Sequence, residues 1–291
     1  MVLQWIVYAK NDLGDESEFM EMLSRSEYSI ICCDNLSGED VVLLQQNIAE
    51  AIGEKRNISD CLMIVTSDTQ YQAACHMHLA TLPYIKSQAL KHPLFDGAWM
   101  VAEGLAEVDE DFLNKAYQRF HHLPWTILYT PRCYLREISM ADMDALFALY
   151  AQKGVTDYME PLYDRPQEEE YERAYIEHMY RYFGYGMWLV CDRQTNEIIG
   201  RAGLEHRDYG DETELEMGYL VSPMRQRMGY ATEICLAIME YARKNLDFPR
   251  LNCLIETENK ASIHLVEKLG FCKLESTGIT GKAMERYVFD L

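Results

Sequence analysis

The feature that most constrains the fold is a strand that passes, through a short turn, into a long amphipathic helix. The segment Glu214–Val221 reads as a strand, and apolar residues recur at helical spacing from Ala231 to Asn245. A junction of this kind brings the start of a helix beside the end of a strand. The residues of the turn therefore decide what the junction can bind.

That turn contains Arg225, Arg227 and Gly229. A helix start carries about four N–H groups without intrahelical partners and roughly half a positive charge. Glycine lets an anion approach the backbone closely, and arginine pairs well with phosphate oxygens. The turn is therefore interpreted as a diphosphate cradle; the alternative is a plain connection with incidental arginines. A Walker A loop and a dinucleotide fingerprint are excluded, because no Gly-Lys-Ser/Thr follows and only one glycine is present.

The chain is expected to form two domains. Pro124 and Pro131 interrupt the sequence, and a new alternating segment begins after them, which predicts a boundary near residue 131, between residues 1–130 and residues 131–291. In the first part, strand-like and helix-like segments alternate, which indicates an α/β domain with a doubly wound parallel sheet. In the second, three strands are followed by strand, helix, strand, helix and strand, which indicates an α+β domain with a mixed sheet.

The first part resembles a known family over one stretch, DCLMIVTSDTQYQAACHMHLATLPYI, from Asp60 to Ile85. This stretch is similar to the last core strand and following helix of haloacid-dehalogenase-like hydrolases. Those enzymes need Asp-x-Asp at the end of the first strand, where this chain has IVYAKND, and Asp68 alone cannot supply the nucleophile. The resemblance therefore implies a degenerate, non-catalytic domain, with an active phosphatase as the alternative.

The second part resembles the GCN5-related N-acetyltransferases, the GNAT superfamily. Gln226-x-x-Gly229-x-Ala231 matches the Q/R-x-x-G-x-G/A signature of that family, and ENKASIHLVEKLGF, GRAGL and EMGYLVSP match further segments in the right order. The last two are similar to the branch that includes the ribosomal-protein N-terminal acetyltransferases. Over residues 131–291 the resemblance implies a GNAT fold with a splayed sheet, and transfer of an acetyl group from acetyl-CoA to a primary amine by direct attack in a ternary complex.

The same resemblance implies the positions that hold acetyl-CoA. Leu220 and Val221 are expected to offer backbone groups to the pantetheine arm, and Asn259 and Ser262 to contact the far side of the cosubstrate. For Asn259 and Ser262 the alternative role is helix capping. The diphosphate is expected to lie against the amides and positive charge of Arg225, Gln226, Arg227, Met228, Gly229, Tyr230 and Ala231.

A general base matters if the acceptor is a lysine-like amine. Deprotonating an amine of pKa ~10.4 at pH 7 costs roughly 4.6 kcal/mol, against about 1.4 kcal/mol for an α-amine of pKa ~8. Three strand carboxylates border the expected cleft, and Glu216 is favoured, then Glu205, then Glu256. Many relatives use a tyrosine to protonate the leaving sulfur where this chain has Val266, so Ser262 or a water is expected to take over.

The acceptor is expected to bind the segment TDYMEPLYDRPQEEEYERAYIEHMYRYFGYG, which ends in a helix near Gln167–Tyr182. Carboxylates and aromatic faces both attract ammonium groups, the latter by about 0.5–2 kcal/mol. The candidates are Asp157, Tyr158, Glu160 and Tyr163. The interpretation is a primary-amine acceptor, small or peptidic, and the alternative is an acidic, solvated helix.

Composition narrows the partners further. The formal charge of −20 argues against nucleic acid, which needs a clustered basic face. No apolar run is long enough for a membrane span, and nine scattered cysteines without a signal sequence suggest reduced thiols in the cytoplasm. The HxH pair at His76 and His78 lacks nearby partners, so no metal is expected. A homodimer is left open, and the rival function is a non-catalytic acetyl-CoA sensor.

Overall fold

A computed structural model describes residues 2–10, 12–13, 16–34, 36, 38–86, 94–210, 212–279 and 282–291. The chain divides into two compact units, Met1–Leu123 and Pro124–Leu291. The boundary falls earlier than the predicted residue 131, because β6 (Thr126–Tyr129) already pairs with β7 (Cys133–Arg136) in the second sheet. Each unit is described by itself.

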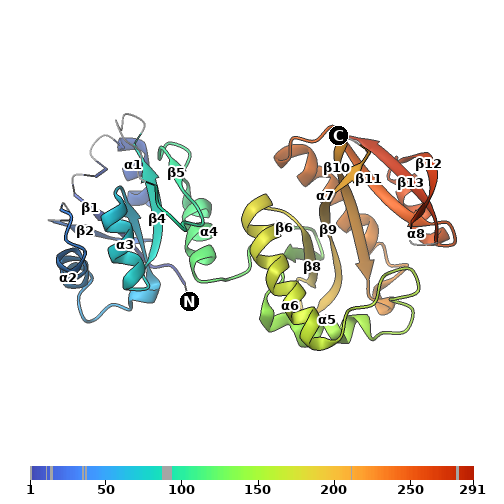
Figure 1. Ribbon diagram of the computed structural model, residues 1–291, viewed down its shortest axis with the longest axis horizontal. Coiled ribbons are helices and arrows are strands. Elements are labelled where there is room, and N and C mark those ends of the chain that lie inside the picture. Colours follow the sequence, from blue (N-terminus) through green and yellow to red (C-terminus); the bar gives the residue numbers. More distant parts are fainter. Residues whose placement is uncertain are drawn as a thin grey trace. The chain divides into compact units, whose positions relative to one another are not determined.

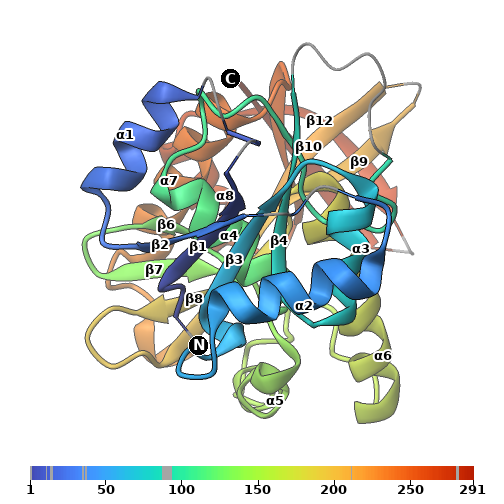
Figure 2. The ribbon, with the colours of Figure 1, turned by 90° about the vertical axis from the view of Figure 1, so that its left-hand side faces the viewer.

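The N-terminal unit is built on a parallel sheet of five strands in the order β2-β1-β3-β4-β5, and Figure 2 shows the first four side by side. This 2-1-3-4-5 order is one of the two common doubly wound arrangements. The predicted parallel sheet is confirmed, and the haloacid-dehalogenase-like label stays a prediction. The strands are β1 (Trp5–Ala9), β2 (Ser29–Cys33), β3 (Cys61–Val65), β4 (Ala80–Ile85) and β5 (Ala102–Glu103).

Helices cover both faces of this sheet (Figure 1). One face packs against α1 (Ser17–Arg25) and α4 (Glu110–Phe120), and the other against α2 (Val41–Ile52) and α3 (Asp68–His76). Every residue of β3 is buried, which is why CLMIV reads as a continuous apolar run rather than an alternating one. A short 3-10 turn, η1 (Ile58–Asp60), precedes β3.

The last strand of this sheet is very short. β5 pairs only with Tyr84 and Ile85 of β4. Within the described residues, no strand lies against this edge of β4 from Ala80 to Pro83, and Pro83 itself has no N–H to donate. Two layers of helices therefore meet at an edge that no strand closes.

The C-terminal unit contains an eight-stranded sheet in the order β12-β13-β11-β10-β9-β8-β7-β6. It is mixed, as predicted, because β10 and β11 run parallel while the other pairs are antiparallel. Both outer pairs contain a register shift, between Lys273 and Glu275 in β12 and between Thr126 and Leu128 in β6. The remaining strands are β8 (Met187–Asp192), β9 (Ile198–Tyr209), β10 (Glu212–Val221), β11 (Arg250–Glu256), β12 (Cys272–Ile279) and β13 (Lys282–Asp290).

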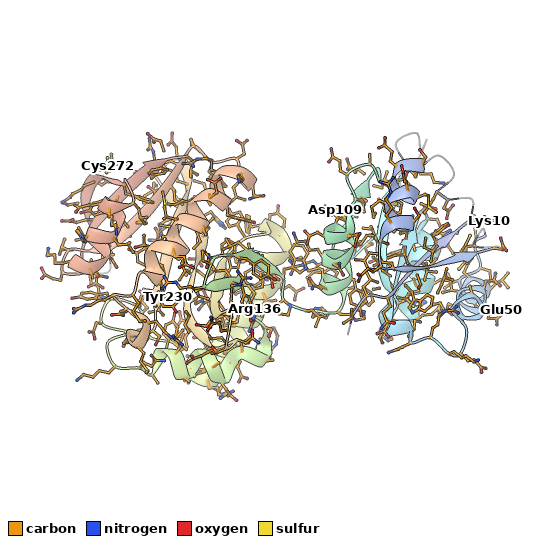
Figure 3. All side chains as sticks on the ribbon, turned by 180° about the vertical axis from the view of Figure 1, so that it is seen from behind. Lys10, Glu50, Asp109, Arg136, Tyr230 and Cys272 are labelled. Carbon is orange, nitrogen blue, oxygen red and sulfur yellow. The ribbon has the colours of Figure 1, made fainter. Side chains whose placement is uncertain are left out.

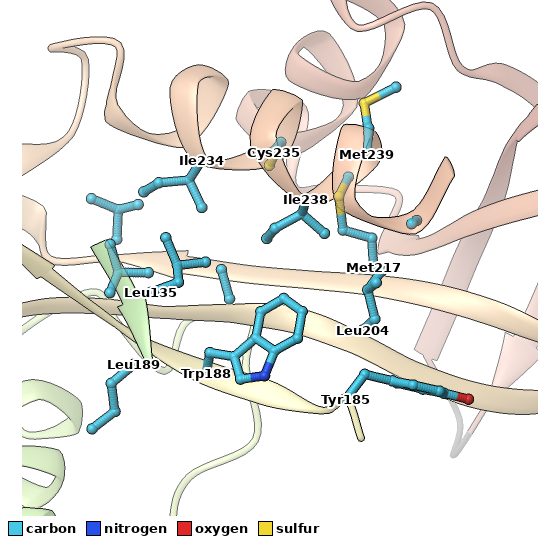
Figure 4. Close-up of a cluster of buried hydrophobic side chains, with 14 of the residues drawn as sticks. Leu135, Tyr185, Trp188, Leu189, Leu204, Met217, Ile234, Cys235, Ile238 and Met239 are labelled. Atoms are coloured by element: carbon cyan, nitrogen blue, oxygen red, sulfur yellow. The ribbon is translucent and has the colours of Figure 1, made fainter. Parts of the chain in front are cut away.

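The long helix α7 (Tyr230–Asn245) packs on β9 and β10. Ile234 and Ile238 extend from it towards Trp188, Leu204 and Met217 on the sheet, and all of these side chains are buried (Figure 4). The other helices are η2 (Met140–Asp142), α5 (Met143–Tyr150), α6 (Arg165–Tyr175), η4 (Pro223–Arg225) and α8 (Lys260–Lys268).

The helix predicted near Gln167–Tyr182 is two elements. α6 ends at Tyr175 and continues as a π-helix, η3 (Ile176–Phe183), which stops at Gly184 with φ 72°. π-helical turns are rare and occur often at functional sites.

Three further observations concern the described residues only. All nine cysteines are free thiols, and seven of them are buried or half-buried while Cys32 and Cys272 are exposed (Figure 3). No described helix combines the length and the apolar character that crossing a bilayer requires. No described group of three or more His, Cys, Asp or Glu residues has the geometry to hold a metal ion.

Candidate active site

The sheet of the C-terminal unit splits between β10 and β11. The two strands pair only at Leu215 with Leu251 and at Glu216 with Asn252. Beyond Glu216 they separate, although β10 continues to Val221 and remains paired with β9 along its whole length. This opening, between residues 217–221 of β10 and residues 253–256 of β11, is called the wedge below.

Alternate residues of β10 point their backbone groups into the wedge. Met217 O accepts a hydrogen bond from Cys253 Sγ (3.5 Å), and Val221 O accepts one from Gln226 Nε2 (3.1 Å), both on the side away from β9. Because these groups alternate along an antiparallel strand, Tyr219 faces the same way. The described pairing with β11 does not reach Tyr219 or Val221, so their N–H groups face the opening rather than a paired strand. Unpaired amides in an opened sheet can bind an extended polar chain.

The expectation for Leu220 has to be corrected. Its carbonyl oxygen faces β9, since a Cβ placed on Gly200 would lie only 2.3 Å from it. Its side chain packs against Leu149 and Val155 on the other side of the sheet from α7. The residue that shares the wedge with Val221 is therefore Tyr219, one position earlier.

The turn that follows the wedge leads directly into α7. Arg227 and Gly229 both have left-handed backbone angles, with φ 59° and 83°. Gly229 is the residue before the first helical turn, and no described side chain caps the amides of that turn. A Cβ at Gly229 would meet only Arg132 Nη2, at 3.6 Å, so glycine is needed here for its backbone conformation rather than for space inside the protein.

The arginines of this turn differ in their surroundings. Arg225 Nη2 lies 3.2 Å from Glu197 and 3.9 Å from Asp192, so its charge is largely balanced. Arg227 is exposed, and its side chain makes no hydrogen bond or ion pair with a described residue. Of the two arginines that the sequence suggested, Arg227 is the one with an uncommitted charge.

Arg132, which the sequence did not suggest, also lies at the start of α7. It comes from the turn between β6 and β7, and its Nη1 donates to Met228 O (2.9 Å) and its Nε to Glu233 (2.7 Å). Its guanidinium covers the ring of Tyr230 at 3.9 Å, a residue labelled in Figure 3. No motif marks Arg132, because its partners are about a hundred positions away in the chain.

The start of α8 lies on the wedge side of Tyr219. Asn259 accepts a hydrogen bond from the N–H of Ser262 (3.1 Å), so the capping role is confirmed for Asn259. The phenol of Tyr219 donates to the carbonyl of Ser262 (3.3 Å). Val266, at the position where relatives carry a tyrosine, is fully buried in the core.

Two of the predicted carboxylates are brought together. Glu205 of β9 and Glu216 of β10 are direct cross-strand neighbours on the sheet face away from α7. Glu216 is held by Arg207 Nε (2.7 Å) and the phenol of Tyr209 (2.8 Å). Burial raises the pKa of Glu216, and the charge of Glu205 acts in the same direction, while Arg207 and Tyr209 oppose it. Glu205 accepts one hydrogen bond, from the phenol of Tyr175 (2.9 Å), and forms no ion pair with a described residue.

Other acidic residues near the wedge have partners. Glu256 pairs with Lys282, and Glu214 pairs with Arg286 (3.1 Å). Asn252 donates to the Glu214 carboxylate (2.8 Å) and accepts from Arg286 Nε (2.9 Å). This buried network fixes the point at which the wedge opens, and Glu205 is a half-buried carboxylate beside it that has no ion pair with a described residue.

The four residues expected to bind the acceptor lie on the exposed segment between α5 and α6. Tyr158 donates to Glu258 O (3.3 Å), which brings this segment next to the start of α8. Tyr163 lies farther along, where its N–H is bound by Glu168 (2.8 Å). Asp157 and Glu160 are exposed. The structure therefore brings Tyr158 to the mouth of the wedge, and the other three remain on the surface.

Comparison with known proteins adds the following. Residues 132–272 match the family model of the acetyltransferase (GNAT) domain. The chain is 31% identical to the uncharacterized N-acetyltransferase YoaA and 30% identical to the uncharacterized protein YkkB, both of Bacillus subtilis; each alignment covers 50% of this chain, with 83% of YoaA and 84% of YkkB. The solved structure of RimL, the ribosomal L7/L12 alpha-N-protein acetyltransferase, superposes with a TM-score of 0.51 at 15% identity, over 59% of this chain and 97% of RimL.

Proposed function

The chain belongs to the GNAT acetyltransferase family and is an acyltransferase, and from this premise we propose that it moves an acetyl group from acetyl-CoA to a primary amine. The observation that carries this proposal is the wedge. Its unpaired amides at Tyr219 and Val221 lead straight to the uncapped start of α7. The N–H groups in both places can donate hydrogen bonds, which the amide carbonyls and the phosphate oxygens of coenzyme A can accept.

The residues present fit coenzyme A in two places. The N–H groups of Tyr219 and Val221 would hold the pantetheine arm, and the amides from Arg227 to Ala231 would hold the diphosphate. Arg227 adds a free positive charge there, while Arg132 shapes the helix start through Met228 and Glu233. Bound in this way, acetyl-CoA supplies an activated acetyl thioester at the end of the wedge.

We propose Glu205 as the group that removes a proton from the acceptor amine. Glu216 was preferred from sequence, but protonating it would break its ion pair with Arg207. Glu205 has no such partner, and the phenol of Tyr175 orients it. The two adjacent carboxylates also make this face attractive to an ammonium group. Glu216 is then a positioning residue, which pairs with Arg207 and keeps a carboxylate next to Glu205.

When coenzyme A leaves as a thiolate, its sulfur has to be protonated or its negative charge has to be stabilised. Val266 cannot donate, and the phenol of Tyr219 lies on the wedge side, near Ser262. Burial raises the pKa of Tyr219, so the phenol keeps its proton at neutral pH and can donate a hydrogen bond rather than transfer the proton. We therefore propose Tyr219, rather than Ser262, as the hydrogen-bond donor that stabilises the leaving thiolate until solvent protonates it.

The test is a thiol-release assay with acetyl-CoA over a panel of primary amines, run beside a calorimetric titration with coenzyme A. We expect binding, and turnover with at least one amine class. Binding without turnover across lysine-like, polyamine and peptide α-amine acceptors would favour the sensor alternative. Turnover restricted to neutral or anionic acceptors would contradict the amine assignment.

For the N-terminal unit we propose a non-catalytic role. The chain has no Asp-x-Asp after β1, which a phosphatase of the haloacid-dehalogenase type requires. Hydrolysis of an aryl phosphate in the presence of magnesium by the full chain would overturn this proposal.

A further inference from the structure

A cavity of about 530 Å³ lies in the N-terminal unit, away from the acetyltransferase residues. It opens where β5 fails to cover β4, and Thr81 and Pro83 form its floor. Helix α3 contributes from one face of the sheet and helix α4 from the other. Its volume is in the range of small-molecule sites, about 300–1,000 Å³.

Aromatic rings and small polar groups dominate the side chains of this cavity. Three large aromatic rings line it, from Tyr71 on α3, Trp99 in the loop before β5 and Phe120 on α4. Three imidazoles, His78, His121 and His122, and the hydroxyls of Ser59 and Thr81 join them; the remaining lining residues are Cys75, Gly97, Ala98, Met100 and Ala116. Asp, Glu, Lys and Arg are all missing from the described lining, so ionic recognition has no basis there.

One of the imidazoles is left with an unmet hydrogen bond. His121 Nε2 is buried and has no partner among the described residues. The ring lies against Tyr117 (4.5 Å between ring centroids) and Phe120 (5.2 Å), and burial lowers the pKa of His121, so the imidazole is neutral near pH 7. A neutral imidazole offers one donor and one acceptor.

We infer that this cavity binds an uncharged, planar heteroaromatic small molecule. Aromatic walls favour a flat ring through offset and edge-to-face contacts. The imidazoles and hydroxyls can both donate and accept, so they favour a ligand with ring N–H donors and with ring nitrogen or carbonyl acceptors. A charged ring of either sign would find no Asp, Glu, Lys or Arg in the described lining, and taking its charge out of water costs more than a cation–π contact returns. This inference does not depend on the proposed acetyltransferase chemistry.

The test uses the full chain and three fused two-ring probes of similar size in calorimetric titrations: indazole (neutral), 2-naphthoate (anionic) and N-methylquinolinium (cationic). Saturating coenzyme A is present in each titration, so that any site for its adenine ring is occupied. We expect indazole to bind at sub-millimolar concentration and the two charged probes at least ten-fold more weakly. Tighter binding of either charged probe, or no binding of indazole, would overturn the inference.

Two variants locate the site. Ala98→Trp fills the cavity from the loop and should weaken indazole binding at least ten-fold, whereas Ala49→Trp, on the exposed face of α2, should leave it unchanged. Thermal melting checks that both variants fold. Should Ala98→Trp not fold, Cys75→Met narrows the cavity from α3 instead. If indazole binds a folded Ala98→Trp or Cys75→Met variant with unchanged affinity, its site lies outside the cavity and the proposal is wrong.

Discussion

The wedge of the C-terminal unit and the cavity of the N-terminal unit both arise where a strand loses a neighbour. β10 separates from β11 after Glu216. β4 pairs with β3 along one edge, but no described strand pairs with its other edge before Tyr84, because β5 is only two residues long. The lining residues differ sharply. Two adjacent carboxylates and an exposed arginine lie beside the wedge, whereas the described lining of the cavity has aromatic rings and imidazoles but no Asp, Glu, Lys or Arg.

This difference shows that the sheet topology creates the two openings, whereas the side chains determine what each opening can bind. An interrupted pairing creates space and leaves the polar edge of a strand accessible in both units. Charged groups at the wedge suit a substrate that changes its charge during reaction. Neutral aromatic groups at the cavity suit a ligand that is recognised by shape and hydrogen bonds. Four changes, three substitutions and a shift of pH, test this difference between the two units.

The largest effect is expected from Glu205→Gln. Loss of a general base typically costs about 10²–10⁴ in rate, and we expect kcat with a lysine-like amine to fall by about 10²–10³ with little change in coenzyme A binding. Glu212→Gln, an exposed carboxylate of the same strand pair, serves as the charge-matched control. A smaller loss than in Glu216→Gln would return the base assignment to Glu216.

Gly229→Val should act on the cosubstrate rather than on the acceptor. A β-branched residue at φ 83° is strained by ~1–2 kcal/mol, and the altered turn should weaken coenzyme A binding by about 10- to 100-fold in calorimetry. Gly210→Val puts the same strain on a hairpin turn with φ 68° and should leave affinity intact. Gly229→Asn, which tolerates this conformation better, should fall in between. Equal affinity in all three variants contradicts the diphosphate cradle.

Tyr219→Phe should have a moderate effect on turnover. A coenzyme A thiolate of pKa ~8.5 is close to neutral-pH stability, so losing the hydrogen bond from the phenol should lower kcat only about 10-fold. The hydrogen bond to Ser262 is long, so stability should change by less than about 1 kcal/mol. Tyr185→Phe removes a hydroxyl elsewhere in the same core and is the control. Equal rates in both variants would leave water as the donor.

The smallest effect is expected from lowering the pH from 7.5 to 5.5. Burial lowers the pKa of His121, with His122 acting in the same direction and Asp60 opposing. The unfolded chain therefore takes up this proton more readily than the folded one, and the stabilising contribution is lost as the pH falls below about 6.5. In urea titrations of the full chain, the free energy of unfolding should fall by less than about 1 kcal/mol over this pH range. The His121→Asn variant should not show this decrease. Indazole binding should weaken a few-fold over the same range.

Features formed by residues that are contiguous in the chain could be predicted from the sequence. Gln226 to Ala231 form one turn, so their spacing is visible directly, and alternation of strands and helices predicts a parallel sheet. Strand order is set by contacts between distant segments, so the open edge of β4 could not be foreseen. The same limit hid Arg132, which reaches the start of α7 from the turn before β7.

The sequence also does not show which side of a strand the N–H and C=O groups of a given residue face. The resemblance placed Leu220 at the cosubstrate, but the alternation of backbone groups along β10 gives that place to Tyr219. A shift of one position reverses which side of a strand a residue serves, and only the hydrogen bonds of the folded sheet fix it. Pairing between Glu205 and Glu216 likewise depends on the register of β9 and β10.

The register shifts in β12 and β6 bear on how copies of this chain could associate. These are the outermost strands of the C-terminal sheet, and an irregular edge carrying Lys273 and Glu275 is a poor template for another strand. Growth of this sheet across two molecules is therefore disfavoured at either end. Self-assembly through the C-terminal unit therefore has to use helical or loop surfaces rather than the edges of its sheet.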